Sequence, residues 1–308
     1  MINKKLPKGF IPVMLTPFNA DKTIDFEGLA HLTDMYIQAG ATGLFANCLS
    51  SEMYELTNKE RLQLVETVVN TTNGRVPIVA TGTLGGTIAE MADFSNQLYT
   101  KGVDAVIVIN SVLVTNNESD AIFLARMHKF MKLTNNIPLG IYECPVPYKR
   151  LITKQILENL LPTGRLIYHK DTSLEIEKVK ERIAIGRTYN FGLYDAYMVN
   201  AVASLQAGAM GLSCIQGNYF PELVVWLYNN FNNDNVLNKV IKVQQFFNEN
   251  MDIMHACYPI SAKYILQKRG INISLTTRRK VGVLTQEMKQ DLDVLLTKYE
   301  ALSIDILT

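Results

Sequence analysis

Residues 76–109 read VPIVATGTLGGTIAEMADFSNQLYTKGVDAVIVI and contain one strand–helix–strand unit. VPIVAT (76–81) and DAVIVI (104–109) are short apolar runs without strict alternation, as expected for parallel strands that are buried on both faces. Between them, Thr87 and Glu90 fit a capping box, in which each side chain satisfies a free backbone amide at the start of a helix. The stretch therefore predicts two parallel strands joined by a helix.

The same unit recurs along the chain, because short apolar runs alternate with amphipathic stretches from residue 9 to about residue 220. The predicted strands are 9–15, 43–47, 76–81, 104–109, 138–142, 166–170, 189–194 and 210–215. Eight strands separated by helices are typical of an α/β protein with a (β/α)8 TIM barrel. A doubly wound open sheet is the main alternative, and the number of strands favours the barrel.

After about residue 220 the strand signals stop and successive amphipathic helices follow. The sequence therefore predicts two parts. Residues 1–225 would form the barrel, and residues 226–308 would form a C-terminal helical extension packed on it.

Composition argues against several classes of protein. Of 308 residues, 48% are hydrophobic and 19% are charged, and the net charge is +1, so no nucleic acid or membrane partner is predicted. The opening MINKKLPKGF has no apolar region typical of a signal peptide, and no apolar stretch is long enough to span a bilayer. The four cysteines are scattered and form no zinc motif. We therefore expect a cytoplasmic protein without a metal.

The stretch LIYHKDTSL (166–174) places a lysine, Lys170, at the end of the sixth predicted strand. Tyr142 ends the fifth strand, and Ser50 and Ser51 follow the second strand in CLSSE. Reactive groups of such barrels lie at the C-terminal ends of the strands. These side chains are therefore predicted to meet at one mouth, whereas alternation along the strand points His169 toward the helices.

This set of groups suits imine chemistry. A lysine that a barrel wall shields from water has a lowered pKa, so part of it is a neutral amine that can attack a ketone. The iminium that forms withdraws electrons, and a carbon–carbon bond at the neighbouring carbon can then form or break. A phenol can move protons, and hydroxyls with loop amides can hold a carboxylate. Taken singly, each residue also fits an ordinary role, as a solvated lysine, a core tyrosine or loop serines.

With these residues, the chain resembles the pyruvate-dependent class I aldolase family that includes dihydrodipicolinate synthase and N-acetylneuraminate lyase. The resemblance runs almost end to end. Its motifs are GFIPVMLTPFNADKTIDFEGL (9–29), CLSSE (48–52), LTNKER (56–61), YECP (142–145), HKDTS (169–173), GAMGLSCIQGN (208–218), KYILQKRGI (263–271) and RRKVGVLTQEM (278–288). The collection is far more specific than any one motif.

The resemblance implies a role for each matching residue. Lys170 would form the Schiff base and Tyr142 would donate and accept protons. Ser50 would bind the carboxylate of a 2-oxoacid, and the backbone of Ser213 would lie against pyruvate. No metal or organic cofactor is implied, since the lysine imine itself takes up the electron pair. The family also implies a homo-oligomer, either a dimer or a tetramer.

The chain departs from the family pattern where the second substrate would bind. Leu49 replaces the first threonine of the family turn, and the loop NSVLVTNNESD (110–120) lacks the relay tyrosine of the synthase. Pro147 stands where the synthase has an arginine. LYDAY (193–197) offers Asp195 as a substrate contact, but Ala196 follows where the sialic acid lyase has a second acid. A different distal pocket is expected, with Glu143, Cys144, Tyr148 and Lys149 as its candidate lining.

The sequence thus predicts a lyase that joins or cleaves a carbon–carbon bond between a 2-oxoacid, with pyruvate favoured, and an aldehyde, for which a sugar acid is one source. Two alternatives stay open. The same imine could serve a sugar-acid dehydratase, or the protein could bind 2-oxoacids without turnover. Leu49 and the missing relay tyrosine motivate the second alternative.

Overall fold

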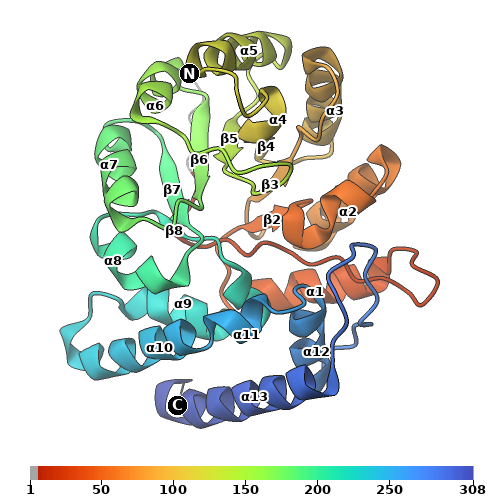
Figure 1. The fold of residues 1–308 in the computed structure, drawn as a ribbon, viewed down its shortest axis with the longest axis vertical. Coiled ribbons are helices and arrows are strands. Elements are labelled where there is room, and N and C mark those ends of the chain that lie inside the picture. The colour runs from red at the N-terminus through yellow and green to blue at the C-terminus, as the bar shows by residue number, and fades with distance from the viewer. Residues whose placement is uncertain (1–5, 308) are drawn as a thin grey trace.

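The computed structural model describes residues 6–307 and contains a parallel sheet of eight strands that curls into a barrel (Figure 1). The strands are β1 (Gly9–Phe10), β2 (Leu44–Ala46), β3 (Ile78–Thr81), β4 (Ala105–Ile109), β5 (Leu139–Tyr142), β6 (Leu166–Asp171), β7 (Gly192–Asp195) and β8 (Gly211–Leu212). Their order is β1-β8-β7-β6-β5-β4-β3-β2, and every neighbouring pair is parallel. All eight predicted strands and the predicted barrel are confirmed.

The first strand is shorter than the predicted 9–15, because its two ends pair with different neighbours. Gly9 and Phe10 pair with β8, whereas Val13 forms an isolated parallel bridge with Phe45 of β2. Pro12, between these pairs, has no N–H to donate, but its carbonyl accepts the Phe45 N–H at 2.9 Å. This seam joins the two ends of the sheet.

Helices alternate with the strands and cover the outside of the barrel (Figure 1). They are α1 (Phe26–Gln38), α2 (Asn58–Thr72), α3 (Ile88–Thr100), α4 (Asn110–Leu113), α5 (Asp120–Leu133), α6 (Lys154–Leu160), α7 (Ile176–Gly186), α8 (Ala201–Gln206) and α9 (Pro221–Asn230). The predicted capping box of Thr87 and Glu90 begins α3, and Thr57 with Glu60 forms another at the start of α2. Each box satisfies backbone amides that the first helical turn leaves free.

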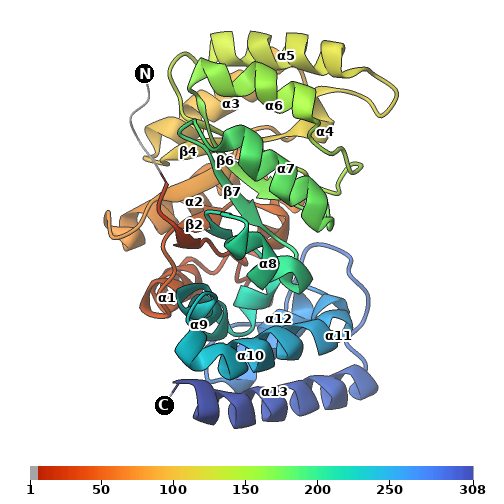
Figure 2. The same cartoon turned by 90° about the vertical axis from the view of Figure 1, so that its left-hand side faces the viewer.

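The C-terminal helices are stacked on one end of the molecule (Figure 2). They are α10 (Leu237–Glu249), α11 (Met251–His255), α12 (Ile260–Lys268) and α13 (Gln286–Leu307). Helix α13 is the outermost layer and packs on α10, α11 and α12. Among the helices of residues 6–307, none is both long and apolar enough to cross a membrane.

The predicted boundary at residues 225 and 226 falls inside α9. Helix α9 packs against β1 and β8, so it completes the ring of helices around the barrel. We propose that the extension begins after α9, and the division into two parts stays a proposal.

The inside of the barrel is filled by aromatic side chains at the level of the strand ends. Tyr168 stacks on Tyr194 with ring centroids 4.8 Å apart, and Phe45 meets the edges of Tyr142 and Tyr168 at 5.8 and 6.0 Å. These rings close the barrel below the mouth, so anything that binds there lies above a packed floor.

Candidate active site

Lys170 lies near the C-terminal end of β6 and points into the barrel. In the parallel register Lys170 is paired with Tyr142 of β5, so the two side chains share the inner face of the sheet. The Nζ atom is 4.4 Å from the centroid of the Tyr142 ring and 5.9 Å from that of Phe45, and only 4% of the residue is exposed. The strand thus delivers an amine to an enclosed aromatic site.

Burial makes the charged form of this amine costly. It lowers the pKa of Lys170 from its usual 10.5. Negative charge on the nearby Cys48, Cys144 or Cys214 would act in the opposite direction, but burial raises the pKa of the Cys144 and Cys214 thiols and so disfavours that charge. A lowered pKa raises the fraction of neutral amine near neutral pH. The pKa of Lys170 is therefore shifted in the direction that favours a nucleophilic lysine.

Tyr142 provides a phenol on the face of the sheet that Lys170 shares. The tyrosine is 3% exposed, and burial raises its pKa well above the usual 10. The hydroxyl therefore keeps its proton at neutral pH and can donate it to an oxygen that gains negative charge.

Above these groups lies a cavity of about 280 Å³. Its lining comes from the strand ends and from the C-terminal helices: Leu49, Ser50, Tyr142, Pro145, Lys149, Lys170, Thr172, Leu174, Ala196, Tyr197, Ile215, Met251, His255, Tyr258 and Arg279. The cavity thus brings together three of the predicted site residues, Lys170, Tyr142 and Ser50.

Two other predicted residues are close in sequence to the site but do not line the cavity. The Ser51 hydroxyl donates to the Met14 carbonyl at 2.7 Å. The Ser213 hydroxyl donates to the Ile11 carbonyl at 2.8 Å and accepts from the Tyr168 hydroxyl at 3.0 Å. Both hydroxyls are therefore used in holding backbone and core in place.

Asp195 lies on the other side of the sheet from the cavity. It is paired with Asp171, which faces Arg182 of α7, and its carboxylate accepts the Tyr197 N–H at 2.8 Å. Burial raises the pKa of Asp195 to about 7. The structure does not bring this carboxylate to the cavity, and of the candidate distal residues only Lys149 lines it.

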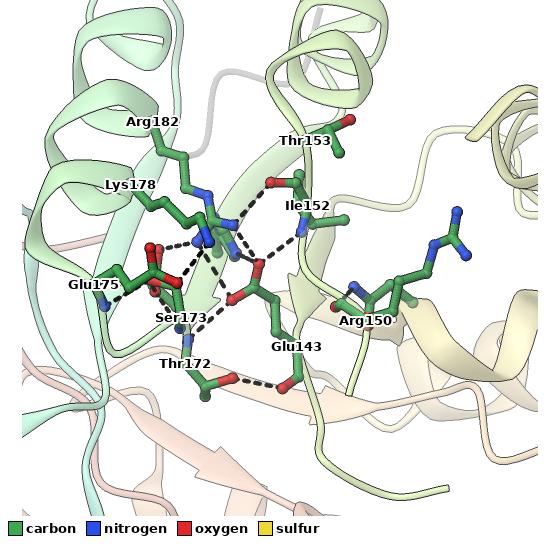
Figure 3. Close-up of polar contacts among 12 residues, drawn as sticks. Glu143, Arg150, Ile152, Thr153, Thr172, Ser173, Glu175, Lys178 and Arg182 are labelled. Atoms are coloured by element: carbon green, nitrogen blue, oxygen red, sulfur yellow. Dashed lines mark hydrogen bonds and ion pairs between the residues drawn. The ribbon is translucent and has the colours of Figure 1, made fainter. Parts of the chain in front are cut away.

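An ionic network lies behind the reactive strand end, on the helix side (Figure 3). The Arg182 guanidinium pairs with Glu143, at 2.8 Å, and with Asp171. Glu143 also accepts the Thr172 N–H at 3.0 Å, and its own carbonyl accepts the Thr172 hydroxyl at 2.6 Å. Glu143 directly follows Tyr142, and Thr172 comes two residues after Lys170. The network therefore fixes the two chain segments that carry the phenol and the amine.

His169 faces this network, as alternation predicted, with Nε2 3.7 Å from Glu143. Glu143, His169 and Asp171 are the kinds of residue that bind metals, and their ligand atoms lie within 4.8 Å of one another. Arg182 already supplies the positive charge that two buried carboxylates require. The cluster is therefore better explained as an ionic support than as a metal site.

Several lining residues that the sequence analysis missed belong to the C-terminal part of the chain. Tyr258 and Arg279 line the cavity although they are far from the strands in sequence. Glu52 anchors this part, because its carboxylate accepts the backbone N–H groups of Arg278 and Arg279 at 2.7 and 2.8 Å. The Lys263 ammonium also lies 3.4 Å from Glu52.

A larger cavity, of about 760 Å³, lies beside the loops that follow β3 and β4. Its lining includes Leu84, Val112 and Tyr148, but its described lining contains none of the six predicted site residues. Volume alone therefore does not identify the reactive site, and the smaller cavity with the buried amine is the candidate.

Comparison with known proteins gives one family and one fold. The model of the dihydrodipicolinate synthetase family matches residues 6–299. A 4-hydroxy-tetrahydrodipicolinate synthase from Oceanobacillus iheyensis is 23% identical over 290 residues, which are 94% of this chain and 96% of the relative.

Two solved structures show the likeness of fold. The prophage protein YagE from E. coli K12, a member of the dihydrodipicolinic acid synthase family solved in complex with pyruvate, has a TM-score of 0.85 at 23% identity, with 95% of this chain and 98% of that chain covered. A catalytic lysine mutant of the Ruminococcus gnavus sialic acid aldolase has a TM-score of 0.85 at 17% identity, with 97% of both chains covered.

Proposed function

The chain belongs to the dihydrodipicolinate synthetase family and is a lyase, and we propose that it forms a Schiff base between Lys170 and a 2-oxoacid, with pyruvate as the first choice. The observation that carries the proposal is the buried amine with a lowered pKa beside a protonated phenol, above a closed aromatic floor. The complex of YagE with pyruvate and the catalytic lysine of the Ruminococcus gnavus aldolase support it.

The proposed reaction begins when the neutral Lys170 amine attacks the keto carbon. Tyr142 protonates the oxygen of the carbinolamine, which leaves as water, and the resulting iminium loses a methyl proton to become an enamine. The enamine carbon then forms a bond to an aldehyde, or the reverse steps break that bond. Ser50, on the wall of the cavity, is the proposed contact of the 2-oxoacid carboxylate. The enamine needs no metal or organic cofactor, because the imine nitrogen accepts the electron pair.

The charges around the cavity favour an aldehyde that carries an acidic group. Lys149 and Arg279 line the cavity from different parts of the chain, and none of the described lining residues is Asp or Glu. Leu49, Leu174 and Met251 add apolar surface to the same lining. An aldehyde derived from a sugar acid that keeps an acid group fits this lining better than a neutral polyol does.

Borohydride reduction in the presence of pyruvate, followed by intact mass measurement, tests the central step. We expect one reduced pyruvate adduct on the wild type and none on Lys170→Met. Lys149→Met is the matched control, since it removes another lysine of the same cavity, and it should still trap pyruvate. A folded wild type without an adduct would refute the proposed function.

A product assay separates carbon–carbon cleavage from dehydration. With a panel of 2-oxo-3-deoxy acids, we expect released pyruvate and an aldehyde, whereas a dehydratase would give a dehydrated acid of the original chain length. Arg279→Gln should lower kcat/KM for aldehydes with an acidic group by about tenfold, in line with roughly 1.5 kcal/mol, the lower end for a hydrogen bond to a charged group. Turnover of neutral aldehydes should change little. Equal losses on both classes would contradict the role given to Arg279.

The family resemblance also supports a homo-oligomer, a dimer or a tetramer, as a proposal. A cytoplasmic location stays a prediction from the sequence.

A further inference from the structure

We infer that Tyr258 is a second proton-carrying phenol of the Lys170 site, delivered within the same chain by the segment between α11 and α12. This inference rests on the proposed function and extends it, because the loop of residues 110–120, where the synthase has a relay tyrosine, contains none. Tyr258 lines the same cavity as Lys170, Tyr142 and Ser50.

The hydrogen bonds around Tyr258 have a fixed direction. The Asn218 side-chain oxygen accepts the Tyr36 hydroxyl at 2.5 Å, so the amide nitrogen of Asn218 is the donor to its other partners. That nitrogen donates to the Val13 carbonyl at 2.9 Å and to the Tyr258 oxygen at 2.5 Å. The Tyr258 oxygen is therefore an acceptor toward Asn218, so its own proton can be donated to another group.

Ser50 lines the same cavity as Tyr258, and hydrogen bonding with the Ser50 side chain lowers the pKa of Tyr258 against the larger rise that burial causes. Hydroxyl groups both donate and accept, so Ser50 can receive a proton from Tyr258 and pass one into the cavity. Tyr142 lines this cavity too, and a negative charge on Tyr258 would raise the pKa of Tyr142 further above the level set by burial.

The relay answers a specific energetic problem. When Tyr142 protonates the carbinolamine oxygen, it becomes a phenolate in a buried site, where a lone charge is costly. Tyr258 gives its proton to Ser50, and Ser50 gives its own proton to the Tyr142 oxygen. The phenolate then resides on Tyr258, where the Asn218 N–H stabilises it. The reverse transfer restores the Tyr142 phenolate, which takes the methyl proton of the iminium. Each proton is returned, so the cycle leaves the enamine and one water.

Exchange of the methyl protons of pyruvate with deuterium from the solvent, followed by proton NMR, measures this half-reaction without an aldehyde. Tyr258→Phe keeps the ring and removes the hydroxyl. We expect its exchange rate to fall at least about tenfold, since acid–base groups contribute roughly 10²–10⁴. Borohydride should still trap the pyruvate adduct on Lys170.

Tyr219→Phe is the matched control. Tyr219 is a buried tyrosine nearby, but its hydroxyl donates to the Met254 carbonyl at 2.6 Å and contacts the Ser261 hydroxyl at 2.7 Å, and it does not line the cavity. Its loss should leave the exchange rate within about a factor of two of the wild type.

The outcomes separate the two proposals. A wild type that forms no adduct refutes the proposed function itself. A wild type that forms the adduct, with unchanged exchange in Tyr258→Phe, refutes only the inference about Tyr258. If Tyr258→Phe does not fold, 3-fluorotyrosine at position 258 tests the relay instead, because this residue keeps the hydroxyl but has a lower pKa than tyrosine. The pH profile of the exchange should then move to lower pH, and an unchanged profile overturns the relay.

Discussion

Lys170 is enclosed by Tyr142 and Phe45, and its amine must lose a proton before it can attack a ketone. Because burial lowers the pKa of Lys170 from 10.5, the neutral fraction should rise with pH through a midpoint below that value. We predict that the rate of imine formation with pyruvate follows this rise and then levels off. Stopped-flow measurement across pH would show it, and a midpoint at 10.5 or above would contradict a shielded amine.

Asp195 gives a prediction about stability. Its folded pKa of about 7 lies above the ordinary 3.8, so the folded state binds more protons between these values. The contribution of Asp195 to the free energy of unfolding is therefore at its maximum below about pH 4, and it is lost as the pH rises through about 7. Asp195→Asn should remove a decline of roughly a few kcal/mol in the free energy of unfolding between pH 4 and pH 8.

Urea titrations of wild type and Asp195→Asn at both pH values measure this difference. Asp93→Asn, at an exposed position, is the control and should keep the decline of the wild type. Because the Asp195 carboxylate lies outside the cavity, its variant should also trap pyruvate normally. A lost adduct would instead favour the substrate contact predicted from the sequence.

Among single residues, the sequence predicted the placement of those on or next to strands better than the placement of those elsewhere. Lys170 and Tyr142 could be placed because strand ends meet at the mouth of a barrel, and Ser50 follows directly from a strand. Alternation also placed His169 correctly. The same alternation, counted from Tyr194, turns Asp195 away from the cavity, whereas the family resemblance predicts a substrate contact there. Tyr258 has no local signal, since packing of distant helices brings it to the site.

Among the elements, a buried carboxylate joins the turn after β2 to the C-terminal segments. Glu52 is fully buried and pairs with Lys263, whose pKa burial lowers to about 8, and it accepts two backbone N–H groups. Glu52→Gln should destabilise the protein by roughly 3–5 kcal/mol, because it leaves a buried ammonium without its partner. Amide exchange should become faster in residues 271–285.

The control for this prediction is Glu66→Gln, which removes an ion pair at the surface with Lys101. Such exposed pairs contribute roughly 0–1 kcal/mol, so unfolding and exchange should change little. Equal effects of the two substitutions would show that Glu52 is no anchor for the extension.

The elements themselves were largely predictable, because parallel strands buried on both faces are apolar runs bounded by helix signals. The first and last residues of each strand were less predictable. The run 9–15 is uniformly apolar, yet only Gly9–Phe10 pairs with β8, since the chain then turns to meet β2. Which neighbour a residue pairs with depends on barrel closure, and no local pattern encodes that.

For the whole molecule we predict a homo-oligomer whose chemistry does not depend on a partner's tyrosine. Light scattering after size exclusion should give a dimer or tetramer of the 34.6 kDa chain. If Tyr258 carries the proton within one chain, the specific rate of pyruvate proton exchange should stay constant on dilution through dissociation. A mass of one chain at micromolar concentration would contradict the assembly, and a rate that falls on dilution would contradict the self-contained site.

The division of the cavity wall between barrel and C-terminal segments has a consequence for engineering. The amine and the phenol stand on β6 and β5, whereas the C-terminal part of the chain contributes Met251, His255, Tyr258 and Arg279 to the lining. The reactive nitrogen and part of the wall that faces the co-substrate are thus carried by separate stretches of polypeptide. A library confined to residues 251–279 that spares Tyr258 would vary what the enzyme accepts while the reactive nitrogen stays in place.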